Sequence, residues 1–183
     1  MIERAYGQLK EGDCEDAAQA FSDCLLLEPV DARAYYGRGM AYFQLKKWGE
    51  AIFDFKKATE LNPEDPESRV SLGMSQALGN KAYDAIETFE TLLSKHPKYV
   101  RGHIQLAQLY YKLGVIAKGH RQMDTALASK PSPDERIQIN AIKKEQLTLD
   151  KKRHYRPDFE ELRRHNRATS GGFLKKLKSL FGL

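Results

Sequence analysis

A spacing of 34 residues separates four prolines, and this spacing constrains the fold more than any other feature of the chain. The prolines are Pro29, Pro63, Pro97 and Pro131. Two further columns keep the same step, which are the small residues Ala5, Gly39, Gly73 and Ala107 and the large residues Phe21, Phe55, Phe89 and Met123. A repeat of this length is a unit that cannot bury its apolar face alone and must stack on its neighbours. The chain is therefore predicted to be a repeat array, whose function lies on its surfaces.

Within each repeat the pattern predicts two antiparallel helices. In the second repeat apolar residues recur at helical spacing over residues 32–45 and 48–61, with polar lysines between the two segments. Gly39 and Ala51 are small enough for the two helix backbones to approach closely. Pro63 ends the second helix because it has no amide hydrogen to donate. Each repeat is thus a helix-turn-helix unit, and the fold class is all-α.

The second repeat resembles the tetratricopeptide repeat (TPR) through the positions Tyr35, Gly39, Tyr42, Ala51, Phe55, Ala58 and Pro63. The resemblance extends over residues 1–131 and implies a right-handed solenoid of about four units. We expect an incomplete unit at 1–31 and full units at 32–65, 66–99 and 100–131. Residues 132–150 are expected to form a capping helix, 151–171 a basic linker with a short helix, and 172–183 an amphipathic helix.

Composition and motifs argue against an enzyme, a metalloprotein or a membrane-spanning protein. The chain has no apolar run near the roughly 20 residues that span a bilayer. Its charged start, with Glu3 and Arg4, is unlike a secretory signal, so we expect a cytoplasmic protein. The sequence contains no glycine-rich phosphate loop and no nucleophile motif, and its cysteines and histidines lack metal-ligand spacing. We therefore expect no catalytic residues, no cofactor and no metal.

The TPR resemblance implies that the first helix of each unit lines a concave face. The residues at these positions are mostly Tyr, Met and aliphatic side chains, namely Tyr6, Leu9, Tyr36, Met40, Phe43, Val70, Met74, Ile104, Gln108 and Tyr111. This composition suits an adaptable groove for an apolar helix or extended segment. The alternative is that single members belong to the core between repeats. Four arginines are expected at the groove rim, namely Arg33, Arg38, Arg69 and Arg101.

The residues of one known TPR binding mode are absent. Family members that clamp the terminal carboxylate of chaperones carry Lys, Asn and further basic residues across three units. The corresponding positions of this chain hold Ile2, Tyr6, Gly37, Glu67 and Ser71. The expected partner is therefore a protein or peptide with an apolar segment.

The C-terminal segment carries the excess of positive charge. Residues 151–183 hold ten Lys or Arg against three acidic residues, a net charge of +7, whereas residues 1–150 carry −2. At the very end, apolar and basic residues separate onto two faces of one helix, with Phe173, Leu174, Leu177, Leu180 and Phe181 opposite Lys175, Lys176 and Lys178. This segment resembles the C-terminal membrane-targeting helices of bacterial cell-division and positioning ATPases. We expect it to hold the protein peripherally on the inner face of an anionic membrane.

Two other interpretations of this C-terminal segment remain open. The amphipathic helix could dock into the chain's own groove or onto a partner, which would make it autoinhibitory or an assembly element. Nucleic-acid binding by the basic residues has support only in their charge and is the weakest of the three hypotheses. One short helix binds a membrane reversibly, so oligomerisation would strengthen its attachment.

Overall fold

The structure is a computed structural model that describes residues 1–154, with side chains to residue 151. Residues Met1–Ala141 form one compact unit, and a second unit begins at Ile142. The predicted amphipathic helix at 172–183 and most of the predicted basic linker lie outside the described residues.

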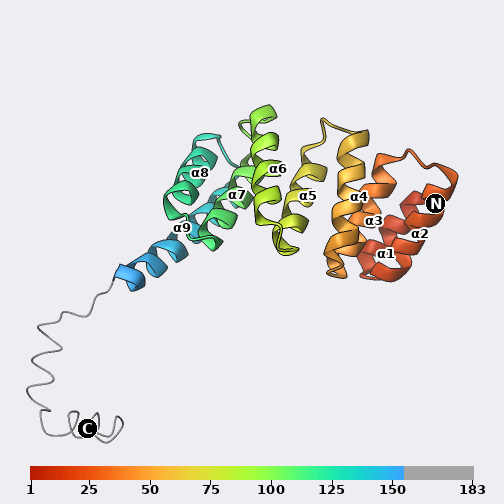
Figure 1. Cartoon of the computed structure of the whole chain (residues 1–183), viewed down its shortest axis with the longest axis horizontal. Helices are drawn as coiled ribbons and strands as arrows, with labels where there is room; N and C mark the ends of the chain where they lie inside the picture. The colour runs from red at the N-terminus through yellow and green to blue at the C-terminus, as the bar shows by residue number, and fades with distance from the viewer. Residues whose placement is uncertain (155–183) are drawn as a thin grey trace, which may run out of the picture. The chain divides into compact units, whose positions relative to one another are not determined.

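The first unit is built from helix pairs that follow one another in chain order (Figure 1). The helices are α1 (Ile2–Glu11), α2 (Cys14–Leu27), α3 (Ala32–Gln44), α4 (Trp48–Leu61), α5 (Pro66–Leu78), α6 (Ala82–Lys95), α7 (Val100–Lys112), α8 (Ile116–Ala128) and the start of α9 (Pro133–His154). Each odd-numbered helix from α1 to α7 packs against the helix after it, and each pair packs on the next. The predicted all-α array of helix-turn-helix units is confirmed.

The turn inside each pair contains one residue in the left-handed region, at a column that also repeats every 34 residues. The residues and their φ angles are Gly12 at 95°, Lys46 at 58°, Asn80 at 61° and Gly114 at 76°. Glycine adopts this conformation without steric cost, whereas lysine does so only where the surrounding structure requires it. The polar break predicted between the helices of the second repeat is therefore a sharp left-handed turn.

In the second and third repeats the core is an aromatic ring that lies against a glycine. Phe55 and Phe89 are buried between the two helices of their units. A Cβ atom on Gly39 would lie 2.9 Å from Phe55 Cδ1, and one on Gly73 would lie 2.7 Å from Phe89 Cε1. These distances are shorter than van der Waals contact, so neither position has room for a side chain. The group that lies against Gly39 is the Phe55 ring.

Aspartates fix the start of two helices that carry the candidate site. The Asp31 carboxylate accepts hydrogen bonds from two backbone amides in the first turn of α3, and Asp65 does the same for α5. Such caps satisfy amide groups that have no partner within the helix. They hold the first turns of α3 and α5 in place.

Helix α9 lies where a capping helix was predicted, at 132–150, and it extends four residues further, to His154. The extension runs through lysines and an arginine, which are good helix formers. Ile139 is fully buried within the first unit. The capping role itself stays a prediction. No helix among the described residues is both long enough and apolar enough to cross a membrane.

Candidate functional site

The predicted groove residues come from α1, α3, α5 and α7, and each of the first three contacts the next helix of this set. We call the surface formed by Tyr6, Leu9, Tyr36, Met40, Phe43, Met74, Gln108 and Tyr111 the inner face. Gln108 is exposed and the other members are half-buried, so each of them presents part of its side chain to solvent.

Two predicted groove residues belong to the core instead. Val70 and Ile104 are 0% and 1% exposed, so neither side chain is open to a partner. Tyr36 occupies the same repeat column and is half-buried. The difference is one of length, because a tyrosine at this position extends to the surface whereas the shorter aliphatic side chains end among their neighbours. The prediction that Val70 and Ile104 line a groove was therefore wrong.

Two of the four predicted rim arginines are also structural. The Arg38 guanidinium donates through Nε and Nη2 to the two carboxylate oxygens of Asp54, both at 2.8 Å, and through Nη1 to the Ser22 hydroxyl. Asp54 is only 1% exposed, so this pair joins α3 to α4 inside the protein. Arg69 is buried and donates to the Pro63 carbonyl at 2.8 Å. Neither guanidinium is a free rim charge.

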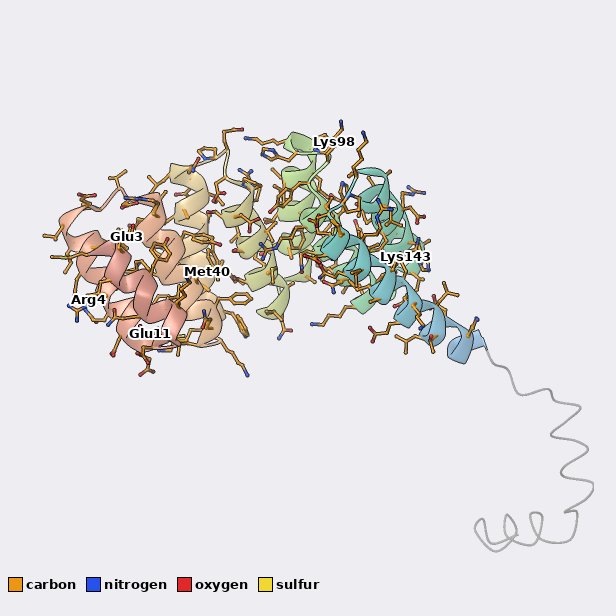
Figure 2. All side chains as sticks on the ribbon, turned by 180° about the vertical axis from the view of Figure 1, so that it is seen from behind. Glu3, Arg4, Glu11, Met40, Lys98 and Lys143 are labelled. Carbon is orange, nitrogen blue, oxygen red and sulfur yellow. The ribbon has the colours of Figure 1, made fainter. Side chains whose placement is uncertain are left out.

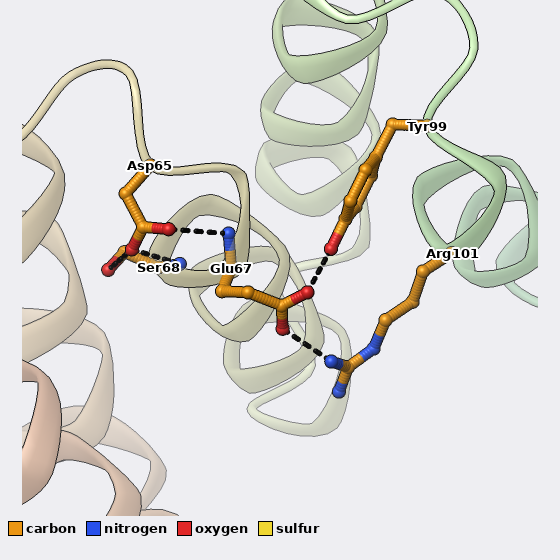
Figure 3. Close-up of polar contacts among 5 residues, drawn as sticks. All are labelled: Asp65, Glu67, Ser68, Tyr99 and Arg101. Atoms are coloured by element: carbon orange, nitrogen blue, oxygen red, sulfur yellow. Dashed lines mark hydrogen bonds and ion pairs between the residues drawn. The ribbon is translucent and has the colours of Figure 1, made fainter.

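Arg33 and Arg101 lie at the surface, and they differ in how closely a carboxylate pairs with each guanidinium. The Arg33 side chain is 70% exposed and lies 3.6 Å from the Asp31 carboxylate. Arg101 donates to the Glu67 carboxylate, which also accepts a hydrogen bond from the Tyr99 hydroxyl (Figure 3). Burial, together with the hydrogen bond to Glu67, raises the pKa of Tyr99. Glu67 therefore neutralises the Arg101 charge within the protein.

The middle of the inner face is apolar and aromatic. The Tyr36 ring lies 5.6 Å from the buried Phe55 ring, and burial raises the pKa of Tyr36. Met40 projects from α3 beside it and packs against the same core cluster (Figure 2). The Phe43 ring meets the Trp48 ring edge to face at 5.3 Å. The Met40 thioether and the rings of Tyr36 and Phe43 each pack against the core on one side and are exposed to solvent on the other.

The tyrosines at the two ends of the inner face are held by their hydroxyl groups. Tyr6 donates to the Arg33 backbone carbonyl at 2.8 Å, and burial raises the pKa of Tyr6 to about 12. The Tyr111 hydroxyl lies 3.0 Å from His120 Nδ1. Its ring lies over Gly119, where a Cβ atom would lie 2.3 Å from Tyr111 Cε1. Glycine at this position therefore makes room for the tyrosine.

Two hollows interrupt the inner face. One has a volume of about 650 Å³ and lies along α1 and the end of α3, beside Tyr6, Leu9 and Gln44. The other has a volume of about 160 Å³ and is lined by Met74, Ala77, Leu78, Phe89, Gln105, Gln108, Leu109 and Lys112. Sequence reasoning missed Ala77 and Lys112. Ala77 stands 34 residues from both Phe43 and Tyr111, so the column step would have found it.

Among the described residues, no group of three or more His, Cys, Asp or Glu side chains is placed to hold a metal ion.

Comparison with known families identifies the repeats. Residues 32–65 and residues 67–99 each match a family model for the tetratricopeptide repeat. The chain is a tetratricopeptide repeat protein. TPR domains bind peptide partners, so the inner face of this TPR array is the candidate surface for a partner.

Curated relatives of this TPR protein are much longer than it is. The peroxisomal targeting signal receptor of Kluyveromyces lactis is 28% identical over 102 residues, which are 56% of this chain and 18% of that protein. The Hsp70-Hsp90 organizing protein 3 of Arabidopsis thaliana is 29% identical over 96 residues, which are 52% of this chain and 17% of that protein. The chain thus spans less than a fifth of either relative.

Solved structures share the TPR fold. A crystal structure of the protein MamA superposes with a TM-score of 0.66 at 22% identity, covering 70% of each chain. A TPR protein of Thermus thermophilus gives a TM-score of 0.65 at 21% identity, covering 75% of this chain and 76% of that one. At these identities the similarity establishes the fold alone.

The positions of a carboxylate clamp are occupied differently in this TPR array. Gly37 and Ser71 are buried, and Glu67 brings a negative charge that pairs with Arg101. The described residues at these positions therefore do not supply a cluster of cationic donors for a terminal carboxylate.

Proposed function

We propose that this TPR protein is a non-enzymatic scaffold that binds an apolar segment of a protein partner on its inner face. The observation that carries the proposal is the set of half-buried Tyr, Met and Phe side chains on α1, α3, α5 and α7. The names of two relatives support it, since one is called a targeting signal receptor and the other an Hsp70-Hsp90 organizing protein.

The inner face has the properties of a binding surface for apolar side chains. Aromatic residues are enriched among the residues that dominate binding energy, and methionine adapts its shape to different ligands. A tyrosine hydroxyl with its ordinary pKa of about 10 is neutral at physiological pH. Burial raises the pKa values of Tyr6 and Tyr36 further. A partner therefore meets a face whose centre is apolar and whose charged residues lie beside it.

Selection of displayed random peptides on the full chain tests this proposal. We expect the selected peptides to be rich in large apolar residues and to lose at least tenfold in affinity for Met40→Glu, because a carboxylate would have to be desolvated in the contact. Tyr83→Glu is the matched control, since Tyr83 lies on α6 and is 87% exposed. Circular dichroism checks that both variants keep the helical content of the parent.

Two results would contradict the proposal. Selected peptides without apolar residues would exclude an apolar ligand, and equal binding by the parent and Met40→Glu would place the contact elsewhere.

We further propose that residues 172–183 attach the scaffold peripherally to the inner face of an anionic membrane. The support is the sequence pattern, in which five large apolar residues lie opposite three lysines. Apolar burial in the headgroup region and attraction of lysines to anionic lipid act together in such segments.

Co-sedimentation of the full chain with vesicles tests the membrane proposal. We expect binding that increases with anionic lipid and is lost in Leu177→Glu. Ser179→Glu changes the charge equally but on the polar face of the predicted helix, so it should retain most of the binding. Equal loss in both variants would mean that charge alone is responsible, and no binding by the parent would favour docking of the segment on protein.

A further inference from the structure

The smaller hollow on the inner face has an apolar floor made by two adjacent repeats. Met74 and Ala77 contribute from α5, Phe89 from α6 and Leu109 from α7. Phe89 and Leu109 are 1% and 5% exposed and belong to the core cluster that Met74 and Ala77 pack against. The floor is therefore a fixed part of the core.

The volume of the hollow selects what can enter it. At about 160 Å³ it is smaller than the roughly 300–1,000 Å³ of sites for small-molecule ligands. It equals the volume of roughly five water molecules in the liquid, at about 30 Å³ each. A single leucine or phenylalanine side chain has this scale, whereas a cofactor does not.

The rim of the hollow is polar and available. The Gln105 and Gln108 amides line it, and neither forms a side-chain hydrogen bond with another described residue. Lys112 is exposed beside them and forms no ion pair with a described residue, in contrast to Arg101, which Glu67 neutralises. The amides can bond to the backbone of an extended segment, and the lysine favours a carboxylate next to the inserted side chain.

We propose that this hollow binds one leucine- or phenylalanine-sized side chain of a partner segment that carries an acidic residue beside it. The inference rests on the proposed function of the inner face and names the chemistry of its ligand. The charge at the rim disfavours the chain's own residues 172–183 as the occupant, because their apolar side chains are flanked by lysines. Like charges would then meet at Lys112.

Carbon-13 methyl resonances of the methionines test the proposal on the full chain. Met74 lines the hollow, whereas Met40 lies on the inner face outside it. The first probe, the glutamate probe, is a short serine–glycine peptide with one leucine between two glutamates. The alanine probe has alanine in place of the leucine, and the lysine probe has lysines in place of the glutamates. The fourth probe is a peptide of residues 172–183. We expect the first probe to shift the Met74 methyl resonance at millimolar concentration, and the alanine probe to bind roughly tenfold more weakly.

Charge reversal at the rim completes the test. Lys112→Glu should weaken the first probe roughly threefold and remove the preference for glutamate over lysine. Lys10→Glu is the matched control because Lys10 occupies the same repeat column on α1, away from the hollow, and it should leave the Met74 shift unchanged.

Each contrary outcome separates the two proposals. Movement of the Met40 resonance without the Met74 resonance overturns the hollow but keeps the inner face, and movement of neither overturns both. Equal shifts from the glutamate and lysine probes refute the acidic neighbour. A stronger shift of Met74 from the 172–183 peptide makes the chain's own segment the occupant.

Discussion

At the scale of single residues, glycines decide how closely the helices pack. Gly37 on α3 lies against Phe21 of the preceding repeat, and a Cβ atom on Gly37 would lie 2.3 Å from Phe21 Cζ. By contrast, a Cβ atom on Gly7 in α1 would meet nothing within 4 Å. The same residue type is therefore a packing requirement at one position and a cost in helix propensity at the other.

Gly37→Ala is expected to lower the free energy of unfolding by about 1–3 kcal/mol, because the added methyl group must displace a buried ring. Gly7→Ala is expected to raise it by about 0.5–1 kcal/mol, because alanine favours the helix and meets no neighbour. Urea unfolding followed by circular dichroism measures both. A stabilised Gly37→Ala variant would show that the Phe21 ring moves aside without cost.

At the scale of helices, an aspartate caps the starts of α3 and α5 but not the start of α2. Asp65 accepts hydrogen bonds from the Glu67 and Ser68 amides at 3.1 and 3.0 Å. Asp13 occupies the corresponding cap position of α2 and forms no such hydrogen bond. The presence of an aspartate before a helix therefore predicts a cap only where the loop directs its side chain toward the amides.

Asp65→Ala is expected to cost about 1 kcal/mol of stability through loss of this cap. Asp13→Ala should change stability by less than about 0.5 kcal/mol, as is usual for surface substitutions. Thermal or urea unfolding of both variants provides the comparison. Equal costs would mean that the cap hydrogen bonds contribute nothing beyond removal of a charged residue.

At the scale of the whole molecule, the repeats of the first unit contact mainly their neighbours, so its stability is expected to be distributed along the chain. Gly37 lies where the first repeat meets the second, and Gly119 lies beneath Tyr111 in the last repeat. Both are sites where an added methyl group overlaps a ring. They provide a matched pair for locating the effect of one perturbation.

Hydrogen exchange measured by mass spectrometry should show this distribution. Gly37→Ala is expected to increase exchange most in α1 and α2, whereas Gly119→Ala should do so most in α7 and α8. If either variant raised exchange uniformly from α1 to α8, the array would unfold as a single cooperative unit.

Periodicity in the sequence was sufficient to predict the architecture. The 34-residue step predicted the pairing of the helices, and the column of small residues identified the close contact at Gly39, because both follow from local geometry that each repeat reproduces. The second repeat shows how accurate the predicted helix bounds are. Its helices were predicted at 32–45 and 48–61 and are found at Ala32–Gln44 and Trp48–Leu61.

The sequence by itself determined the repeat unit, the helices and the approximate direction of each side chain. Only the tertiary structure decided which side chains of that direction reach solvent, as it did for Met74 against Val70 and for Arg33 against Arg38. The physical reason is that helical periodicity gives an angle around one helix axis. Exposure and charge pairing depend also on side-chain length and on residues that neighbouring helices bring into contact from 16 to 34 positions away.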